Sequence, residues 1–130
     1  KLVGLARRHL DEPEGPLSDA FMRHEIAQVG MDEQCFAYTL RRIQQAREGG
    51  KAPGPESSIV KLFGSDLKQK WWELGTRIAG AQASGWEGPG FEEEDLTMTR
   101  EWLRSRGNTI EGGTSEIQLN IVAKRVLGLP

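Results

Sequence analysis

The sequence has only one cysteine, Cys35, among its 130 residues. One thiol cannot form an internal disulfide or a cysteine cluster for a metal ion, so we expect an intracellular, reducing environment. The sequence also has no apolar run near the ~20 residues of a membrane-spanning helix, which excludes a transmembrane protein. Its first residues, KLVGLARRHLDEPEG, lack the apolar segment of a signal peptide.

Clustered positive charge is missing as well. Seventeen Lys and Arg residues face 19 Asp and Glu residues, which gives a net charge of -2. No stretch concentrates basic residues as the tracking of a phosphate backbone requires. The two histidines, His9 and His24, have no Cys, Asp or Glu partner at a recognisable metal-binding spacing. We therefore expect no nucleic-acid partner and no metal site.

The remaining composition is typical of one globular domain, with 37% hydrophobic and 28% charged residues. Residues 1–10 have a helical composition, and the two prolines and one glycine of residues 11–16 must interrupt that helix. A domain rarely begins inside a helix. We expect residues 1–130 to form a single domain that was cut from a longer polypeptide.

Two long helices follow in the predicted organisation. Ser18 is a candidate cap for the first, which ends at Gly49 and Gly50. The second is predicted over residues 57–79, because its apolar residues recur every three or four positions. The stripe of the first helix consists of Met22, Ile26, Val29, Phe36, Leu40 and Ile43. The stripe of the second consists of Ile59, Phe63, Leu67, Trp71, Leu74 and Ile78.

The C-terminal third predicts shorter elements. Four glycines and a proline make residues 80–91 a long loop. The acidic residues 92–95 are interpreted as the solvated start of a short helix that Trp102 and Leu103 anchor and that ends before Gly107. Ser115 and Gln118 match a capping box for the last helix. No strand pattern is present, so the predicted fold class is all-α, with a helix bundle of three principal helices and one or two shorter ones.

Several residue types that often carry chemistry have a plainer interpretation here. Cys35 adjoins the apolar stripe and is predicted to pack in the core, because no partner base can be identified for it. Three of the four tryptophans fall in helices, where core packing is expected. Trp86, in the glycine-rich loop, is the one candidate for a ligand contact.

The segment NTIEGGTSEIQ, residues 108–118, is the most suggestive local motif. Its two glycines allow a ligand to approach the backbone closely, and the free amides at the start of the following helix favour an anionic group. The alternative is a glycine turn followed by an ordinary helix cap. The motif alone does not decide between these interpretations.

The sequence of this region closely resembles a known family. TIEGGTSEIQLNIVAKRVLGLP, residues 109–130, resembles the C-terminal signature of acyl-CoA dehydrogenases, and EWLRSRGNT and SIVKLFGSDLKQKWWELGTRIAG resemble upstream segments of that family in the same order. The resemblance implies the C-terminal four-helix bundle, of up-down type, of a larger subunit. The family desaturates acyl-CoA thioesters: a glutamate base removes the α proton and FAD accepts a hydride from the β carbon.

The family's base position aligns with Gly112, which cannot accept a proton. Glu111 lies one residue earlier and is the candidate catalytic base if the loop turns differently. Two alternatives remain open. The base is supplied by another helix or by residues before Lys1, or the subunit does no chemistry and pairs with a catalytic one.

The resemblance also implies contacts to FAD. Thr114, Ser115 and Glu116 match the segment that touches FAD at the start of the last helix, although Glu116 replaces a glutamine of some relatives. Arg77 and Gly80 match a stretch that approaches the FAD of a neighbouring subunit, with Arg77 in place of the usual glutamine.

The predicted function is therefore that of the C-terminal domain of an FAD-dependent acyl-CoA dehydrogenase that resembles bacterial members, and we expect it in the cytoplasm. The alternative is a non-catalytic helical assembly module of the same fold. The resemblance implies an acyl-CoA substrate, an electron-transfer flavoprotein or similar acceptor, and a homo- or hetero-tetramer. We expect the isolated fragment to be inactive, to bind FAD poorly and to self-associate.

Overall fold

The computed structural model describes residues 1–10, 14–52 and 54–130. These residues form helices and no strand, which confirms the predicted all-α class. The α-helices are α1 (Leu2–His9), α2 (Ala20–Glu48), α3 (Glu56–Ala79), α4 (Glu93–Ser105) and α5 (Ser115–Ile121). Two short 3-10 helices (Gly80–Ser84 and Arg106–Thr109) and a terminal π-helical turn (Val122–Val126) complete the described part.

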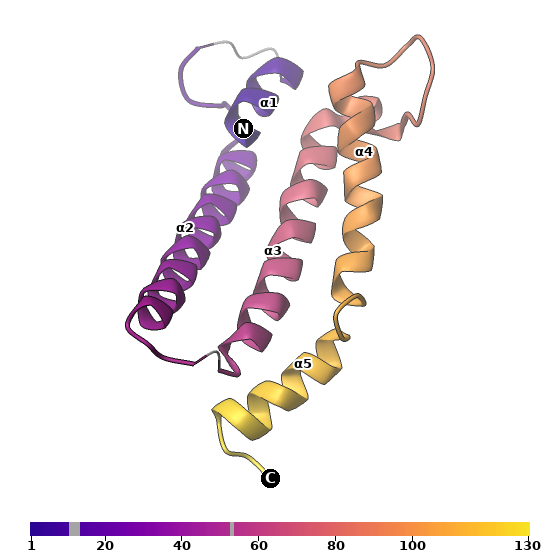
Figure 1. Ribbon diagram of the computed structural model, residues 1–130. Helices are drawn as coiled ribbons and strands as arrows, with labels where there is room; N and C mark the ends of the chain where they lie inside the picture. Colours follow the sequence, from indigo (N-terminus) through magenta and orange to yellow (C-terminus); the bar gives the residue numbers. More distant parts are fainter. Residues whose placement is uncertain (11–13, 53) are drawn as a thin grey trace.

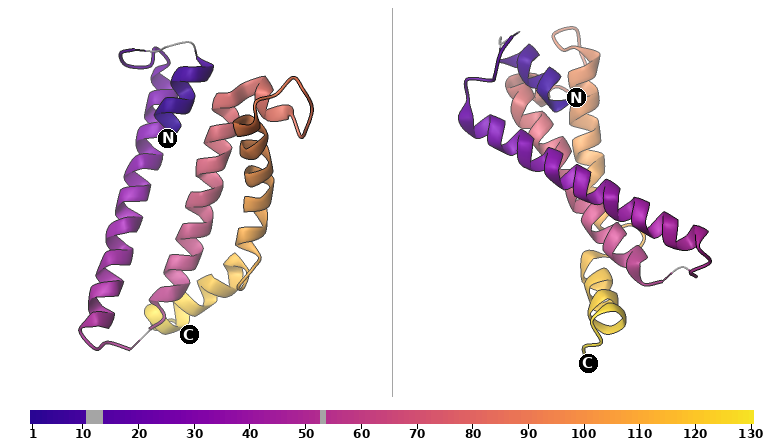
Figure 2. Two further views of the ribbon diagram at one scale, coloured as in Figure 1. Left: turned by 45° about the horizontal axis from the view of Figure 1, so that its top comes forward. Right: turned by 90° about the vertical axis from the view of Figure 1, so that its left-hand side faces the viewer.

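The bundle is organised around α3, which contacts α1, α2, α4 and α5. Helices α2, α3 and α4 run in alternating directions, and α5 lies across the end of the bundle where α3 begins (Figure 1). Seen from the side, α2 crosses α3 obliquely (Figure 2). The short helix α1 sits at the opposite end of the bundle, near the C-terminal half of α3.

The apolar core lies at that α1 end of the bundle. Its buried residues are Leu2, Leu5, Ala6, Leu17, Met22, Val29, Leu67, Leu74, Ile78 and Met98. The apolar stripe continues toward the other end, but Leu40, Ile59 and Phe63 are exposed there. No helix in the described ranges is long and apolar enough to cross a membrane.

Helix caps differ from the sequence prediction by one residue. Asp19 caps α2, since its Oδ1 accepts a hydrogen bond from the Met22 amide at 3.0 Å. Thr114 caps α5, since its hydroxyl accepts from the Ile117 amide at 3.4 Å. The predicted caps, Ser18 and Ser115, were therefore wrong, because a neighbouring residue of equal capping ability takes the position.

Three predictions about burial were also wrong. Cys35 is exposed on α2 rather than packed in the core. Leu103 is 47% exposed and does not anchor α4. Asp95, in the acidic run that we expected to be solvated, is 1% exposed and bonds to Arg8 and His9 of α1. Each error concerns which way a helix faces its neighbours, and that orientation depends on tertiary packing.

Candidate functional site

The candidate site is a glycine turn between α4 and α5. A short 3-10 helix follows α4, and the amides of Ile110 and Glu111 both donate to the Gly107 carbonyl at 3.0 Å. The chain then reverses at Gly112 (φ 67) and Gly113 (φ 100). Residues with a Cβ rarely adopt this left-handed region, which explains the two glycines. A Cβ on Gly112 would meet nothing within 4 Å, so one side of the turn is open.

The carbonyl groups of this turn are held by two side chains. The ammonium group of Lys61, on α3, donates to Gly113 O at 2.6 Å and to Thr109 O at 3.2 Å. Gln118 of α5 is buried, and its Nε2 donates to Gly112 O at 2.9 Å. The same Nε2 would lie 2.8 Å from a Cβ on Gly113. The turn is therefore fixed from the bundle side by hydrogen bonds rather than by apolar packing.

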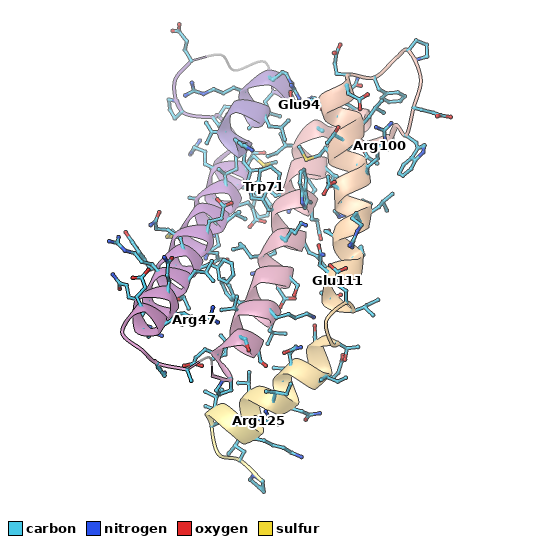
Figure 3. The ribbon with its side chains drawn as sticks, viewed as in Figure 1. Arg47, Trp71, Glu94, Arg100, Glu111 and Arg125 are labelled. Atoms are coloured by element: carbon cyan, nitrogen blue, oxygen red, sulfur yellow. The ribbon has the colours of Figure 1, made fainter. Side chains whose placement is uncertain are left out.

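Glu111 lies beside the C-terminal end of α4, where its side chain is bonded (Figure 3). Its carboxylate accepts from Arg104 at 2.8 Å and from Asn108. These two bonds, with the Arg104 bond dominant, lower the pKa of the Glu111 carboxyl below its usual value. The side chain is 52% exposed. In this conformation Glu111 is a stabilised anion, and its carboxylate must leave Arg104 and Asn108 before it can act as a base.

The start of α5 already carries a carboxylate. The pKa of the Glu116 carboxyl is lowered, first by a hydrogen bond from its own backbone amide and second by the Thr114 hydroxyl. A negative charge at this end of a helix is favourable because the amide dipoles point toward it. Glu116 thus occupies part of the donor set that the sequence assigned to a ligand, while the predicted capping bond of Ser115 is absent.

The second group of predicted cofactor residues lies at the other end of α3. Arg77 pairs with Glu25 of α2 at 3.2 Å and lies over the Phe21 ring at 5.6 Å. Gly80 ends α3, and a Cβ there would meet nothing within 4 Å. Lys61 and Arg77 are roughly 24 Å apart along the helix axis. The structure therefore does not bring Arg77 and Gly80 together with Thr114, Ser115 and Glu116.

Two polar atoms beside the turn are buried without a partner among the described residues. They are Nε1 of Trp102 and Oδ1 of Asn108. Trp102 also carries the Arg106 guanidinium over its ring at 5.0 Å. Buried polar atoms normally find a partner, so these two are exceptions to full hydrogen bonding near the end of α4.

Trp86, which we predicted to contact a ligand, interacts with Arg100 of the same chain. The Arg100 guanidinium lies 5.7 Å from the Trp86 ring centre, and Arg100 donates to Trp86 O at 2.8 Å.

Trp71 and Trp72 pack edge to face, with ring centres 4.6 Å apart, beside an open groove of about 640 Å³ between α2 and α3. In the described part of the chain, no three His, Cys, Asp or Glu side chains gather as they would around a metal ion.

Comparison with known proteins assigns this fold and turn to a family. Residues 2–127 match the family described as "Acyl-CoA dehydrogenase, C-terminal domain". The chain belongs to the acyl-CoA dehydrogenase family. This confirms the resemblance carried by residues 109–130. Members of the acyl-CoA dehydrogenase family are oxidoreductases and, in general, flavoproteins.

Two curated acyl-CoA dehydrogenases show the extent of the similarity. FadE34 of Mycobacterium tuberculosis is 31% identical over 86% of this chain and 14% of its own length. IpdE1 of Mycolicibacterium smegmatis is 32% identical over 99% of this chain and 29% of its own length. The chain therefore spans less than a third of either acyl-CoA dehydrogenase.

A solved structure shares the fold. A chain of the ChsE4-ChsE5 complex from Mycobacterium tuberculosis superposes with a TM-score of 0.77 and 21% identity. The superposition covers 99% of this chain and 35% of that chain. The likeness confirms the helical fold.

Sequence analysis missed three residues that shape the turn of this acyl-CoA dehydrogenase domain. Arg104 and Asn108 hold Glu111, and Lys61 holds the carbonyls of the turn. Asn108 lies inside the motif that the sequence singled out and could have been found there. Lys61 gave no signal, because its contacts join residues about 50 positions apart.

Proposed function

We propose that this chain is the C-terminal domain of an FAD-dependent acyl-CoA dehydrogenase, a longer protein that desaturates an acyl-CoA thioester between its α and β carbons. The family match over residues 2–127 carries the proposal. The glycine turn supports it, because its open side at Gly112 leaves room for a ligand against the backbone.

We propose contacts to FAD at two separate places. Thr114, Ser115 and Glu116 would hold polar groups of one flavin with hydroxyl and carboxylate oxygens at the start of α5. Arg77 and Gly80, at the far end of α3, would face the flavin of a neighbouring subunit, with a guanidinium suited to a diphosphate and open space beside the glycine. The bound flavin supplies the hydride acceptor for the reaction.

The proton step is assigned to Glu111. Gly112 occupies the family's base position and has no side chain, so Glu111 is the carboxylate nearest to that position in the sequence. Its bonds to Arg104 and Asn108 lower its pKa and so weaken it as a base, which is why the carboxylate must leave both partners before it accepts the proton. Rotation about its side-chain bonds would move the carboxylate from α4 toward the open side of Gly112.

The whole protein is proposed to use an acyl-CoA substrate, to pass electrons to an electron-transfer flavoprotein or a similar acceptor, and to work in the cytoplasm. We propose a homo- or hetero-tetramer assembled through the helical domain. The exposed apolar residues of α2 support this assembly. The isolated chain is expected to bind FAD poorly, and tight stoichiometric binding in an FAD titration would contradict that expectation.

A second candidate function is a non-catalytic assembly module of the same fold. Two observations favour it: glycine occupies the base position, and the nearest carboxylate is paired with Arg104 and Asn108. In that case the start of α5 would contribute to the structure of a partner's flavin site without taking part in proton transfer.

A single experiment separates the two functions. The full-length protein is purified with FAD and mixed with acyl-CoA thioesters of different chain length, and flavin reduction is followed by absorbance. We expect reduction by the parent protein and a loss of more than about 100-fold in Glu111→Gln. Glu101→Gln, which removes a carboxylate near Arg104 but not from the turn, should behave as the parent.

Each other result has a clear meaning. An FAD-loaded parent that is reduced by none of the thioesters would support the assembly module. A parent that is reduced as fast as its Glu111→Gln variant would place the base elsewhere in the protein.

A further inference from the structure

The turn that carries the candidate base, Glu111, is hydrogen-bonded to the central helix α3 through the side chain of Lys61. The Lys61 ammonium donates to Gly113 O at 2.6 Å and to Thr109 O at 3.2 Å. These carbonyls stand at the two ends of the turn and bracket Glu111 and Gly112. An ammonium group has three donors, so one lysine can bridge both ends at once.

The bridge is anchored on a rigid element. Lys61 belongs to α3, the helix that contacts α1, α2, α4 and α5. The lysine is half-buried, so solvent and salt screen its charge less than that of a fully exposed lysine. Hydrogen bonds from a charged donor are about twice as strong as neutral ones. The bridge therefore ties the position of the turn to α3.

The other side-chain hydrogen bonds from α3 described near the turn do not reach Gly112 or Gly113. Gln69 Nε2 donates to Ser105 O at 3.2 Å and lies 3.4 Å from the Thr109 hydroxyl, so it holds only the chain that enters the turn. Gln118 holds Gly112 O but belongs to α5, which follows the turn. Among the described residues, Lys61 alone links α3 to both ends of the turn.

We propose that Lys61 is a positioning residue for this site. Its ammonium sets the distance between α3 and the turn, and so places the backbone of Gly112 and the carboxylate of Glu111 relative to a substrate bound beside the turn. The kinetic consequence of this role rests on the proposed dehydrogenase function, whereas its effect on the turn does not.

The test compares three variants of the full-length, FAD-loaded protein. Lys61→Met keeps the length of the side chain and removes its donors, and Lys61→Arg keeps the charge and donors. Lys68→Met is the matched control, because Lys68 also acts electrostatically on Glu111 from α3 but has no hydrogen bond to the turn. If Lys61→Met does not fold, Lys61→Gln, which keeps one amide donor, replaces it.

The first measurement is amide hydrogen exchange of residues 109–116. We expect exchange about tenfold faster in Lys61→Met, intermediate in Lys61→Arg and unchanged in Lys68→Met. Unchanged exchange in a folded Lys61→Met protein would overturn the proposal. This arm gives an answer even if the protein reduces no flavin.

The second measurement is steady-state turnover, provided that the parent is active. A positioning role predicts that kcat falls about 10- to 100-fold in Lys61→Met while KM changes little, with partial recovery in Lys61→Arg. A parent-like kcat in a Lys61→Met protein with fast exchange would show that the turn's placement does not matter to the reaction, and would overturn the catalytic part of the inference.

Discussion

Glu111 shows how the neighbours of one carboxylate determine its chemistry. The guanidinium of Arg104 and the amide of Asn108 both donate to it, and together they lower its pKa. A carboxyl whose pKa is lowered in the folded state contributes stability above its unfolded pKa, and this stability is lost as the pH falls through the lowered folded pKa. The pair therefore favours the folded turn at neutral pH and ceases to do so in acid.

Removing Arg104 should release this carboxyl. In Arg104→Gln the pKa of Glu111 is expected to rise toward its ordinary value, because the largest cause of the lowering is gone. The measurement is an NMR titration of the Glu111 side chain. Lys68→Met should shift the midpoint in the same direction but by less, since Lys68 acts only through space. An unchanged midpoint in Arg104→Gln would contradict the ion pair.

Gly113 is the residue of the turn that least tolerates a side chain. It combines a φ of 100 with a position where a Cβ would lie 2.8 Å from Gln118 Nε2. Gly113→Ala should lower the free energy of unfolding by about 2–3 kcal/mol, since it adds backbone strain and displaces a buried hydrogen bond. Gly112→Ala adds only the strain and should cost about 1–2 kcal/mol. Urea denaturation of the 130-residue chain measures both, and equal losses would contradict the crowding at Gly113.

At the scale of the element, α1 is joined to α4 by a buried polar contact. Asp95 is 1% exposed, and its Oδ1 accepts from His9 Nε2 at 2.9 Å and from Arg8 at 3.1 Å. A buried carboxylate is tolerated because these donors satisfy it. The contact holds the short helix against the bundle in addition to the apolar packing of Leu2 and Leu5.

Asp95→Asn should therefore destabilise the chain by about 1–2 kcal/mol, because a charge-assisted pair becomes a neutral one. The loss should be accompanied by faster hydrogen exchange in α1. Glu93→Gln, on an exposed residue of the same helix turn, should leave the free energy of unfolding nearly unchanged. Equal effects of the two variants in urea denaturation would argue against a special role for Asp95.

The helices themselves were largely predictable. Apolar periodicity and the glycines and prolines between the segments placed α2 and α3 within a few residues of their observed bounds. The caps of α2 and α5 were not, because Asp19 and Thr114 each stand next to a serine that can also cap a helix. The sequence shows which residues are able to cap a helix, whereas the local backbone geometry determines which of them does so.

At the scale of the whole molecule, the apolar surface is unevenly covered. The core lies at the α1 end, while on α2 the side chains of Met31, Tyr38 and Leu40 are 54%, 61% and 41% exposed. Phe63 of α3 is 39% exposed as well. An apolar surface of this kind is typical of an interface between proteins or domains.

The isolated chain is therefore expected to self-associate. Sedimentation velocity at high protein concentration should show species larger than a monomer, because association removes exposed apolar side chains on two sides of α2 from water. Leu40→Glu should shift the distribution toward the monomer. Arg41→Glu, on an adjacent polar position of α2, should leave it unchanged, and a purely monomeric parent would contradict the expectation.

The sequence by itself determined the all-α class, the long helices and the family, because periodicity and a local motif are properties of consecutive residues. It also singled out the turn with Gly112 and Gly113. Only the tertiary structure decided that Asp95 is buried, that Cys35 is exposed and that Lys61 and Arg104 hold the turn. Those facts depend on how helices rotate and pack against one another, and contacts between residues far apart in the chain leave no periodic trace in a single sequence.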